Sequence, residues 1–408
     1  MAPTDSTVRP SMARHGRFVT AIVIDSIGTG VFIPVTMLYF LASTSLTLVQ
    51  VGAALTTAGL LALPAGPLVA GLTDRYGTKP VLQAANLAQA LGFAGYLVVG
   101  QTWQIIICAW LCSAGRAVFS GCYGVTVTAL AAPGQRERWF GLLGSVRNLG
   151  YALGGLLSAV AVSIGSHGAY AAIVAINAMS YLTAFALMRA LPNTRPPAGR
   201  DAGGGWQHVL RDRRYLPIVG HQLCFAISLF ALNIAIPVYA VDVLGLPGWT
   251  AGAVFTLNTL MVGFGQTLVV GRLSGRVRSR VLVMGHACFA AGYLLFLAAD
   301  RVAVLALAVT VVLFGAGSYT LGEILGGPIT STVAAESAPD ALRGRYLAVN
   351  QLAVTAAGTI APIALSGLLS TGAAAIWLTL VGVSALGATL ATVMGRMVPA
   401  ARSRIGDV

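Results

Sequence analysis

Charged residues are scarce in this chain of 408 residues. Only 9% of the residues are charged and 57% are hydrophobic, whereas an ordinary soluble domain has roughly 25% charged residues. Lys79 is the sole lysine. Together with a mean hydropathy of +0.82, this balance excludes soluble enzymes, disordered tails and secreted disulfide scaffolds. The composition predicts an all-α membrane protein.

Cysteines and catalytic motifs are also sparse. The five cysteines all lie in apolar segments, so we expect small buried side chains rather than a metal site or a disulfide framework. They are Cys108, Cys112, Cys122, Cys224 and Cys288. No phosphate-cradling P-loop and no Ser–His–carboxylate set is visible in the sequence. We therefore expect no enzyme activity, no cofactor and no metal.

Long apolar runs are what the sequence does contain. A helix needs about 20 apolar residues to cross a membrane, and twelve such stretches can be marked off. They span approximately 18–41, 47–70, 80–100, 102–130, 140–163, 168–188, 215–240, 250–270, 280–299, 302–332, 346–370 and 373–396. The first run has no small-residue cleavage site, so we interpret it as a retained span rather than a secretory leader.

Basic residues are distributed unevenly between alternate loops. Twenty-two of the 25 Lys and Arg residues fall on one side of the predicted topology, and only Arg301 falls on the other. By the positive-inside rule, both termini are predicted to face the cytosol. Charges scattered between apolar runs also argue against a nucleic-acid partner. The expected partners are the lipid bilayer, protons and a small-molecule substrate, and the chain is expected to be a monomer.

A polar stretch over residues 191–214 divides the chain. It contains three prolines and the run Gly203-Gly204-Gly205, which is typical of a linker. Short sequences recur on either side of it: Ile33-Pro34-Val35 matches Ile236-Pro237-Val238. The sequence therefore predicts two six-helix bundles, over 1–190 and 215–408. Duplicated bundles with a binding site between them are a transporter design.

The loop between the second and third predicted spans resembles a signature of the major facilitator superfamily. It reads Gly71-Leu72-Thr73-Asp74-Arg75-Tyr76-Gly77-Thr78-Lys79, close to the pattern G-x-L-a-D-R-x-G-R-K, with Ala70 and Thr78 departing from it. The resemblance implies twelve transmembrane helices in two pseudo-symmetric six-helix bundles. It also implies that Asp74, Arg75, Gly77 and Lys79 form a conformational latch, in which Gly77 permits a tight turn.

Two further patterns are similar to those of the twelve-helix drug:proton antiporter branch. Arg116 followed by Gly121 resembles a signature of the fourth helix. The segment Gly150-Tyr151-Ala152-Leu153-Gly154-Gly155 stands where antiporters carry G-P-x-x-G-G, with Tyr151 in place of the proline. Gly150 and Gly154 are expected to act with the latch, or alternatively to serve ordinary helix packing.

Few ionisable groups remain inside the predicted spans. A charge near the bilayer centre costs about 2.5–3.5 kcal/mol on insertion scales, so each such group is expected to face a cavity or a partner. In the superfamily, the first, fourth, seventh and tenth helices line the central cavity. Four of the five ionisable groups in the predicted spans fall on these helices, so the resemblance implies that these four face the cavity. The five are Asp25, Arg116, Arg147, His221 and Glu323.

We predict that Asp25, Arg116 and Glu323 couple protons, with Asp25 and Arg116 as a pair poised to exchange a proton. The alternative is a static pair that braces helices, and Glu323 could equally be structural. Arg147 is expected to be shallow enough to reach the interface. The predicted substrate cavity comprises Asp25, Arg116, Arg147, Asn148, His221, Asn233, Glu323 and Asn350. Asn258 could bond either substrate or another helix.

These observations lead to one functional hypothesis and two alternatives. The hypothesis is a proton-coupled secondary transporter of a bacterial cytoplasmic membrane that exports a small hydrophobic or amphipathic compound by alternating access. The first alternative is a proton-linked or facilitative importer of a small nutrient, which the missing proline at Tyr151 keeps open. The second is a membrane sensor that binds a ligand without moving it.

Overall fold

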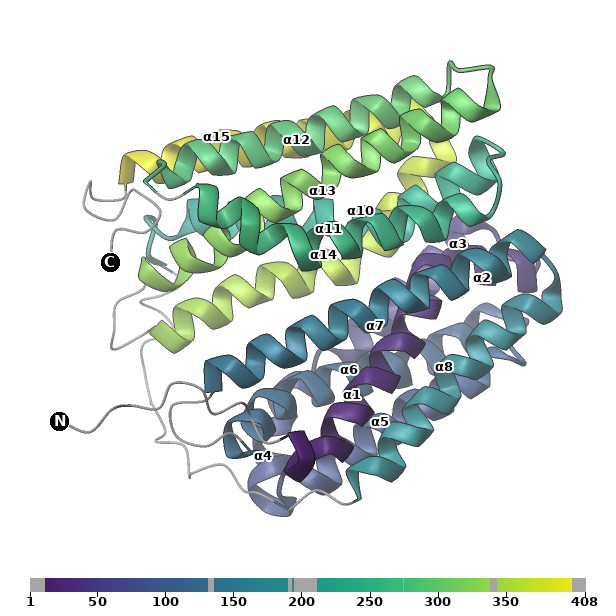
Figure 1. The fold of residues 1–408 in the computed structure, drawn as a ribbon, viewed down its shortest axis with the longest axis vertical. Helices are drawn as coiled ribbons and strands as arrows, with labels where there is room; N and C mark the ends of the chain where they lie inside the picture. The colour runs from purple at the N-terminus through teal and green to yellow at the C-terminus, as the bar shows by residue number, and fades with distance from the viewer. Residues whose placement is uncertain are drawn as a thin grey trace.

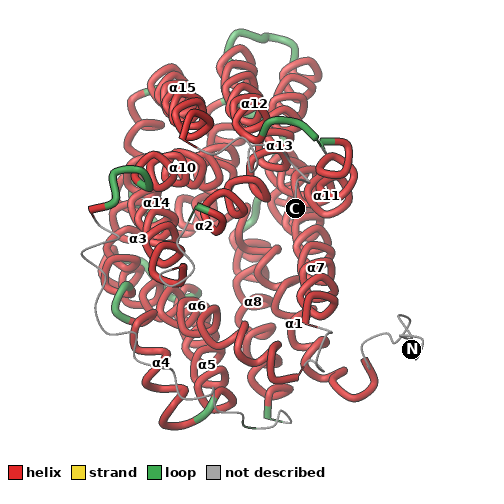
Figure 2. Tube along the Cα trace, turned by 90° about the vertical axis from the view of Figure 1, so that its left-hand side faces the viewer, coloured by secondary structure: helices red, strands yellow, loops and turns green. Residues whose placement is uncertain are grey.

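Helices account for every regular element that the structure describes. The computed structural model describes residues 12–130, 136–189, 193, 211–273, 275–337 and 343–397. Figure 2 shows helices joined by short loops throughout this part of the chain. The predicted all-α class is confirmed.

The first part of the chain begins with α1 (Met12–Phe32), the 3-10 turn η1 (Ile33–Val35) and α2 (Thr36–Ser43). It continues with α3 (Leu48–Ala62), α4 (Ala65–Tyr76), α5 (Thr78–Tyr96), α6 (Thr102–Leu130), α7 (Arg136–Ile164) and α8 (His167–Met188). The second part comprises α10 (Leu216–Val238), the π-helical turn η2 (Tyr239–Val243), α11 (Trp249–Arg272), α12 (Arg278–Ala299), α13 (Leu305–Glu336), α14 (Arg343–Thr371) and α15 (Ala373–Met397).

Proline explains where two of the predicted spans are interrupted. The first span tightens into η1 at Pro34, because proline cannot donate the backbone hydrogen bond that an α-helix requires. The second span breaks between α3 and α4, where Pro64 is the N-cap residue of α4. The start of α3 is defined by a capping box between Thr47 and Gln50, which satisfies two amide groups at the helix end.

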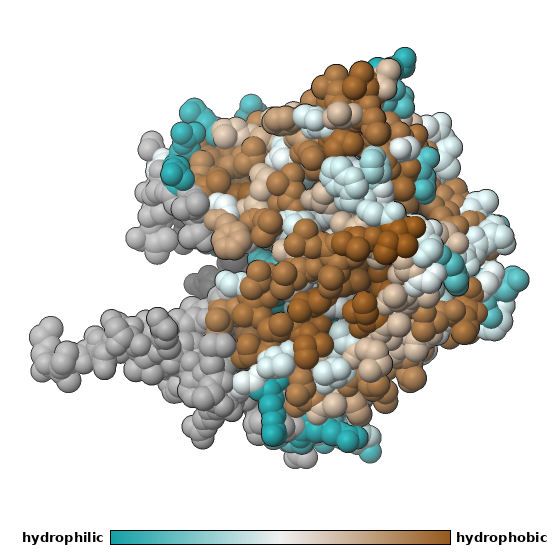
Figure 3. Space-filling model, turned by 45° about the vertical axis from the view of Figure 1, so that its right-hand side comes forward, coloured by the Kyte–Doolittle hydropathy of each residue, from teal (hydrophilic) through white to brown (hydrophobic). Residues whose placement is uncertain are grey.

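Eight of the described helical segments are long and apolar enough to cross a membrane. Figure 3 shows apolar side chains covering most of one face of the molecule. The chain is therefore a multi-pass membrane protein, whereas the count of twelve spans and the cytosolic termini stay predictions. The eight segments are Gly16–Ser43, Thr102–Tyr123, His167–Met188, Leu216–Val243, Arg278–Ala299, Leu305–Ala334, Tyr346–Thr371 and Ala373–Arg396.

The helices pack mainly with helices of their own part of the chain. In the first part, α1 packs on α7 and α8, and α5 packs on α6 and α8. In the second part, α12 packs on α13 and α15, and α10 packs on α14 and α15. The predicted linker is described only at Asn193 and from Arg211 onward, so the domain boundaries stay predictions.

Two helix pairs, α7 with α11 and α3 with α14, join the two parts of the molecule. The Thr256 hydroxyl of α11 donates to the carbonyl of Ala152 in α7 at 3.5 Å. The amide of Ile363 in α14 donates to the Thr56 hydroxyl of α3 at 3.1 Å. These contacts lie toward the ends of α7 and α14 that are remote from both chain termini (Figure 1). The two parts therefore meet at the end of the molecule opposite the termini.

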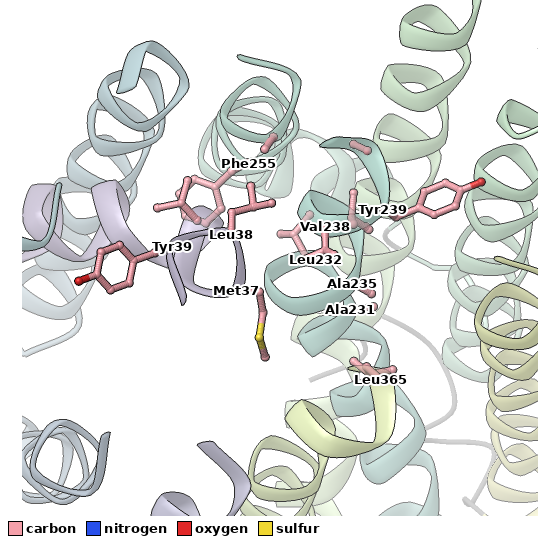
Figure 4. Close-up of a cluster of buried hydrophobic side chains, with 14 of the residues drawn as sticks. Met37, Leu38, Tyr39, Ala231, Leu232, Ala235, Val238, Tyr239, Phe255 and Leu365 are labelled. Atoms are coloured by element: carbon pink, nitrogen blue, oxygen red, sulfur yellow. The ribbon is translucent and has the colours of Figure 1, made fainter. Parts of the chain in front are cut away.

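An apolar plug closes that end. Leu38 of α2 lies toward Leu232 and Val238 of α10, with Phe255 of α11 beside them, and Met37 belongs to the same buried cluster (Figure 4). All five side chains are buried. Because apolar surface removed from water stabilises a contact by about 25 cal/mol per Å², this plug favours the arrangement in which the end remote from the termini is shut.

Glycines bring α7 against α1. A Cβ atom at Gly150 would lie 2.6 Å from the Ser26 Cβ, and one at Gly154 would lie 2.6 Å from the Gly30 carbonyl carbon. Both separations are shorter than real Cβ contacts, so only glycine permits this approach. Gly30 itself packs on the Tyr151 backbone, which gives it a packing role.

We expect Gly154→Ala to destabilise the fold by about 1–3 kcal/mol, because the added methyl group overpacks the contact between α1 and α7. Gly144→Ala on the same helix is the control, since a Cβ atom there meets nothing within 4 Å and alanine favours the helix. Thermal unfolding in detergent measures both variants. Equal unfolding temperatures for the two would contradict the packing role of Gly154.

Candidate functional site

Asp25 lies at the centre of a polar group formed by α1, α6 and α7. Its side chain is only partly buried, and it interacts electrostatically with Arg147 and, more weakly, with Arg116. Among the described side chains, the one ion pair with nitrogen and oxygen within 4.0 Å is Arg278–Glu336. The carboxylate is therefore near two guanidinium groups and in direct contact with neither.

Arg147 contacts aromatic side chains of α6 and of its own helix, α7. It is the twelfth residue of α7, and its Nη2 donates to the Tyr151 hydroxyl at 3.0 Å. Its guanidinium also lies over two aromatic rings, 5.7 Å from the Tyr123 centroid and 5.8 Å from that of Tyr151. The side chain is thus held by two aromatic partners, and whether it reaches the membrane interface stays a prediction. Cation–π contacts of this kind contribute about 0.5–2 kcal/mol each.

Arg116 is exposed although groups from several helices lie near it. Its charge interacts with Tyr181 of α8, Tyr151 of α7 and Asp25 of α1. Tyr181 is buried and shares a hydrogen bond of 3.0 Å with Thr29, so these neighbours mark the interior of the bundle. An exposed arginine among interior groups indicates a space that water can reach between the helices.

The second part of the chain contributes a separate carboxylate. Glu323 of α13 accepts a hydrogen bond of 2.7 Å from the Asn258 amide of α11. The same amide nitrogen lies 3.2 Å from the Thr320 hydroxyl. Glu323 is partly exposed. Its bonded neighbours are neutral, in contrast to those of Asp25, so the two parts of the chain hold their acids in different electrostatic settings.

His221 does not face a cavity in this conformation. Its side chain is 0% exposed, and its Nε2 lies 3.2 Å from the Nε2 of His286 on α12, which is 2% exposed. Phe225 stacks on the His221 ring. The Nδ1 atoms of both histidines are buried without a hydrogen-bond partner. The predicted cavity position of His221 is replaced by a packed pair that joins α10 to α12.

The three predicted asparagines lie at different places. Asn148 is partly buried and approaches Gly263 of α11, so it lies where the two parts of the chain meet. Asn233 is partly buried, with its Oδ1 unpaired inside α10. Asn350 donates to the Gln222 Oε1 at 3.4 Å and so links α14 to α10. Of the three, Asn148 lies on the same helix as Arg147.

The predicted latch forms the turn between α4 and α5. Gly77 adopts a φ of +84°, a conformation that side chains rarely adopt. Asn193 bridges the turn, donating to the Tyr76 carbonyl at 2.9 Å and accepting from the Lys79 amide at 3.3 Å. Arg75 is exposed at this turn. The side chain of Asp74 lies outside the described part of the structure, so its role in the latch stays a prediction.

Several contacts could not be foreseen from the sequence. In the sequence, Tyr151 was singled out only because it replaces the proline of the antiporter pattern. In the structure, its hydroxyl accepts a hydrogen bond from Arg147. The contacts of His286 and Asn193 could not be predicted from the sequence, because their partners are distant in the chain. Arg278 and Glu336 join α12 to α13 at 2.5 Å. In the described residues, no group of three metal-ligating side chains gathers.

A family model described as Major Facilitator Superfamily matches residues 18–362. Among curated proteins, the multidrug resistance protein MdtH of Klebsiella pneumoniae (strain 342) is 26% identical, covering 82% of this chain and 81% of that protein. The protein of the same name from Shigella boydii serotype 4 (strain Sb227) is 24% identical, covering 86% of each.

Solved structures share the fold at low identity. The nucleoside transporter NupG superimposes with a TM-score of 0.79 at 12% identity, covering 93% of this chain and 98% of that one. A bacterial homolog of the human lysosomal transporter Spinster gives a TM-score of 0.70 at 12% identity, covering 97% and 99%. At this level of identity the likeness concerns the fold alone.

The histidine pair gives a stability prediction. We expect His221→Phe and His286→Leu each to lower the unfolding temperature, because each leaves the other ring buried without its Nε2 partner. The double variant should cost less than the sum of the two, since it removes both polar groups together. Thermal unfolding of the four proteins measures this coupling. Additive losses would mean that the two rings do not stabilise each other.

Proposed function

Because the chain belongs to the Major Facilitator Superfamily, we propose that it is a proton-coupled exporter of small hydrophobic or amphipathic compounds. Its family and its relatives are transporters, so it is a transporter and not an enzyme. The printed names of the relatives, multidrug resistance protein, support export of such compounds. The bacterial cytoplasmic membrane is the proposed location.

The proposed topology has twelve spans, two bundles joined by the linker 191–214, and both termini in the cytosol. The uneven distribution of basic residues supports this orientation. The contacts between the two parts lie at the end remote from the termini, so the arrangement corresponds to a transporter open toward the cytosol. Rocking of one bundle against the other would then expose the site to the outside.

The proton site is proposed at Asp25. The observation that carries the proposal is a partly exposed carboxylate influenced by two guanidinium groups, Arg147 and Arg116, without a direct ion pair to either. A fixed ion pair would hold its proton state, whereas a carboxylate that is close to cations but unpaired can gain and lose a proton as its surroundings change. Protonation removes the negative charge that offsets the two arginines.

Glu323 is proposed as a second protonatable group. Its carboxylate accepts a hydrogen bond from the Asn258 amide, and its position on α13 puts it in the other bundle. A cycle in which protons bind one or both carboxylates from outside, and substrate displaces them from inside, would couple export to the proton gradient. Each elementary charge moved through 100 mV then contributes about 2.3 kcal/mol.

The proposed substrate cavity lies between the bundles beside Arg116, Arg147 and Asn148. Tyr123 and Tyr151 supply aromatic surface there, and such surface suits a compound with an apolar body and a polar group. His221, Asn233 and Asn350 would have to become accessible in another conformation to contact substrate. The latch residues Arg75, Gly77 and Lys79 would act on the equilibrium between conformations.

An importer of a small nutrient is the second candidate. Tyr151 stands at the position where antiporters of this branch carry proline, and it bonds Arg147. A phenol at this position makes the fifth predicted span unlike that of a typical antiporter. The direction of proton-driven flux separates the two candidates.

We expect Asp25→Asn to abolish proton-driven accumulation of substrate in inverted vesicles, because the amide cannot exchange a proton. Asp300→Asn is the matched control, since Asp300 is exposed beyond the end of α12. A panel of hydrophobic cations, neutral antibiotics and sugars is assayed under an imposed pH gradient. Full accumulation by Asp25→Asn would remove this residue from the mechanism, and uptake in the opposite direction would favour the importer.

The two arginines should differ in their influence on the pH dependence of transport. Removing positive charge near Asp25 makes protonation easier, so the pH profile should move to higher pH. The shift should be larger for Arg147→Gln than for Arg116→Gln, because Arg147 exerts the stronger effect on the carboxylate. Transport rates across a pH series measure both. Unchanged profiles would leave Asp25 and the arginines as a static brace.

A further inference from the structure

An apolar groove on the outer surface of the first bundle has no part in the proposed transport path. Its volume is about 410 Å³, and it lies between α4, α5 and α6. The floor is made of small residues, among them Ala84, Ala88 and Ala114. Gly115 lets the two helices approach, because a Cβ atom there would lie 2.7 Å from the Ala85 carbonyl oxygen. The groove exists because small floor residues stand between larger rim residues.

The rim of the groove is built from large exposed side chains. Leu72, Tyr76 and Trp110 line it and are 38%, 48% and 41% exposed. The groove extends from the turn between α4 and α5 toward Trp110, along the first turns of α5. An apolar groove that runs along α5 between exposed apolar side chains offers a surface on which a lipid acyl chain can lie.

One end of the groove is basic. The guanidinium of Arg75 lies 5.2 Å from the centroid of the Tyr76 ring, which lines the groove. Lys79 is partly exposed and directly precedes the lining residue Pro80. Both charges therefore lie at the end of the apolar channel nearest the chain termini. Arginine and lysine there would meet the phosphate of a lipid whose chain fills the groove.

We propose that this groove binds one anionic phospholipid of the leaflet on the side of the chain termini. An acyl chain lies against Ala84, Ala88 and Ala114, and the headgroup phosphate contacts Arg75 and Lys79. Burial of each methylene group favours binding of any lipid, while the two basic residues give preference to a negative headgroup. Because Arg75 and Lys79 belong to the turn between α4 and α5, the bound lipid contacts the segment proposed as the latch.

The test uses Trp110 as a reporter in the full chain. The protein is reconstituted in nanodiscs that contain phosphatidylglycerol or phosphatidylcholine with brominated acyl chains, which quench nearby tryptophan. The quenching that is due to Trp110 is obtained as the difference in tryptophan fluorescence between the wild type and Trp110→Phe. We expect phosphatidylglycerol to reach half-maximal quenching at a lower mole fraction than phosphatidylcholine does. The difference should be about fivefold for each basic residue that contacts the headgroup.

Two variants separate the groove from the headgroup site. Ala84 is exposed at the groove, so Ala84→Phe should fill it and reduce Trp110 quenching by both lipids. Leu87→Phe on the same helix lies outside the lining residues and should leave quenching unchanged. Replacing Arg75 and Lys79 together by glutamine should preserve quenching and remove the preference for phosphatidylglycerol. Unfolding temperatures verify that each variant is folded.

Equal quenching by the two lipids in the wild type would overturn the proposal and indicate ordinary lipid contact without headgroup recognition. Quenching that Ala84→Phe and Leu87→Phe reduce equally would also overturn it. None of these readouts depends on transport, so failure of the proposed export leaves the lipid site standing, and the reverse also holds.

Discussion

The structure depends on how ionisable groups are accommodated among apolar helices. Asp25, Arg116 and Arg147 would each be costly in hydrocarbon, at about 2.5–3.5 kcal/mol on insertion scales. Their costs are offset in different ways: Arg147 bonds Tyr151 and lies over two rings, Arg116 remains exposed, and Asp25 interacts with both. A water-accessible space between helices is the arrangement that satisfies all three, and that space is where a transporter needs its site.

Apolar packing closes one end of the molecule. Apolar side chains of α2, α10 and α11 meet at the end remote from the termini (Figure 4). The close contacts of α7 with α11 and of α3 with α14 lie toward the same end. Apolar contacts are not directional, so they can separate without breaking hydrogen bonds or ion pairs. An apolar cluster between the two parts therefore suits the proposed alternation between conformations. The polar group around Asp25 is formed by helices of the first part of the chain alone.

Much of the fold could be predicted from the sequence, because apolar runs carry local information. The predicted run 346–370 corresponds to α14 (Arg343–Thr371), whereas the run 18–41, predicted as one continuous span, is interrupted by η1 at Pro34. The site could be predicted only in part. Residue types and depth singled out Asp25 and Arg147, but the partner of each depends on how helices rotate about their axes. His221 illustrates this limit, since its partner His286 lies on another helix and had no signal.

The central claim is that Arg116 faces water inside the protein, and cysteine labelling tests it most directly. The five native cysteines are replaced by serine or alanine, and Arg116→Cys is introduced. The control restores Cys112, one helical turn away and 6% exposed. A membrane-impermeant thiol reagent is applied in turn to each side of the membrane. The account predicts labelling of position 116 from the side of the termini and no labelling of Cys112. Position 116 inert from both sides would contradict it.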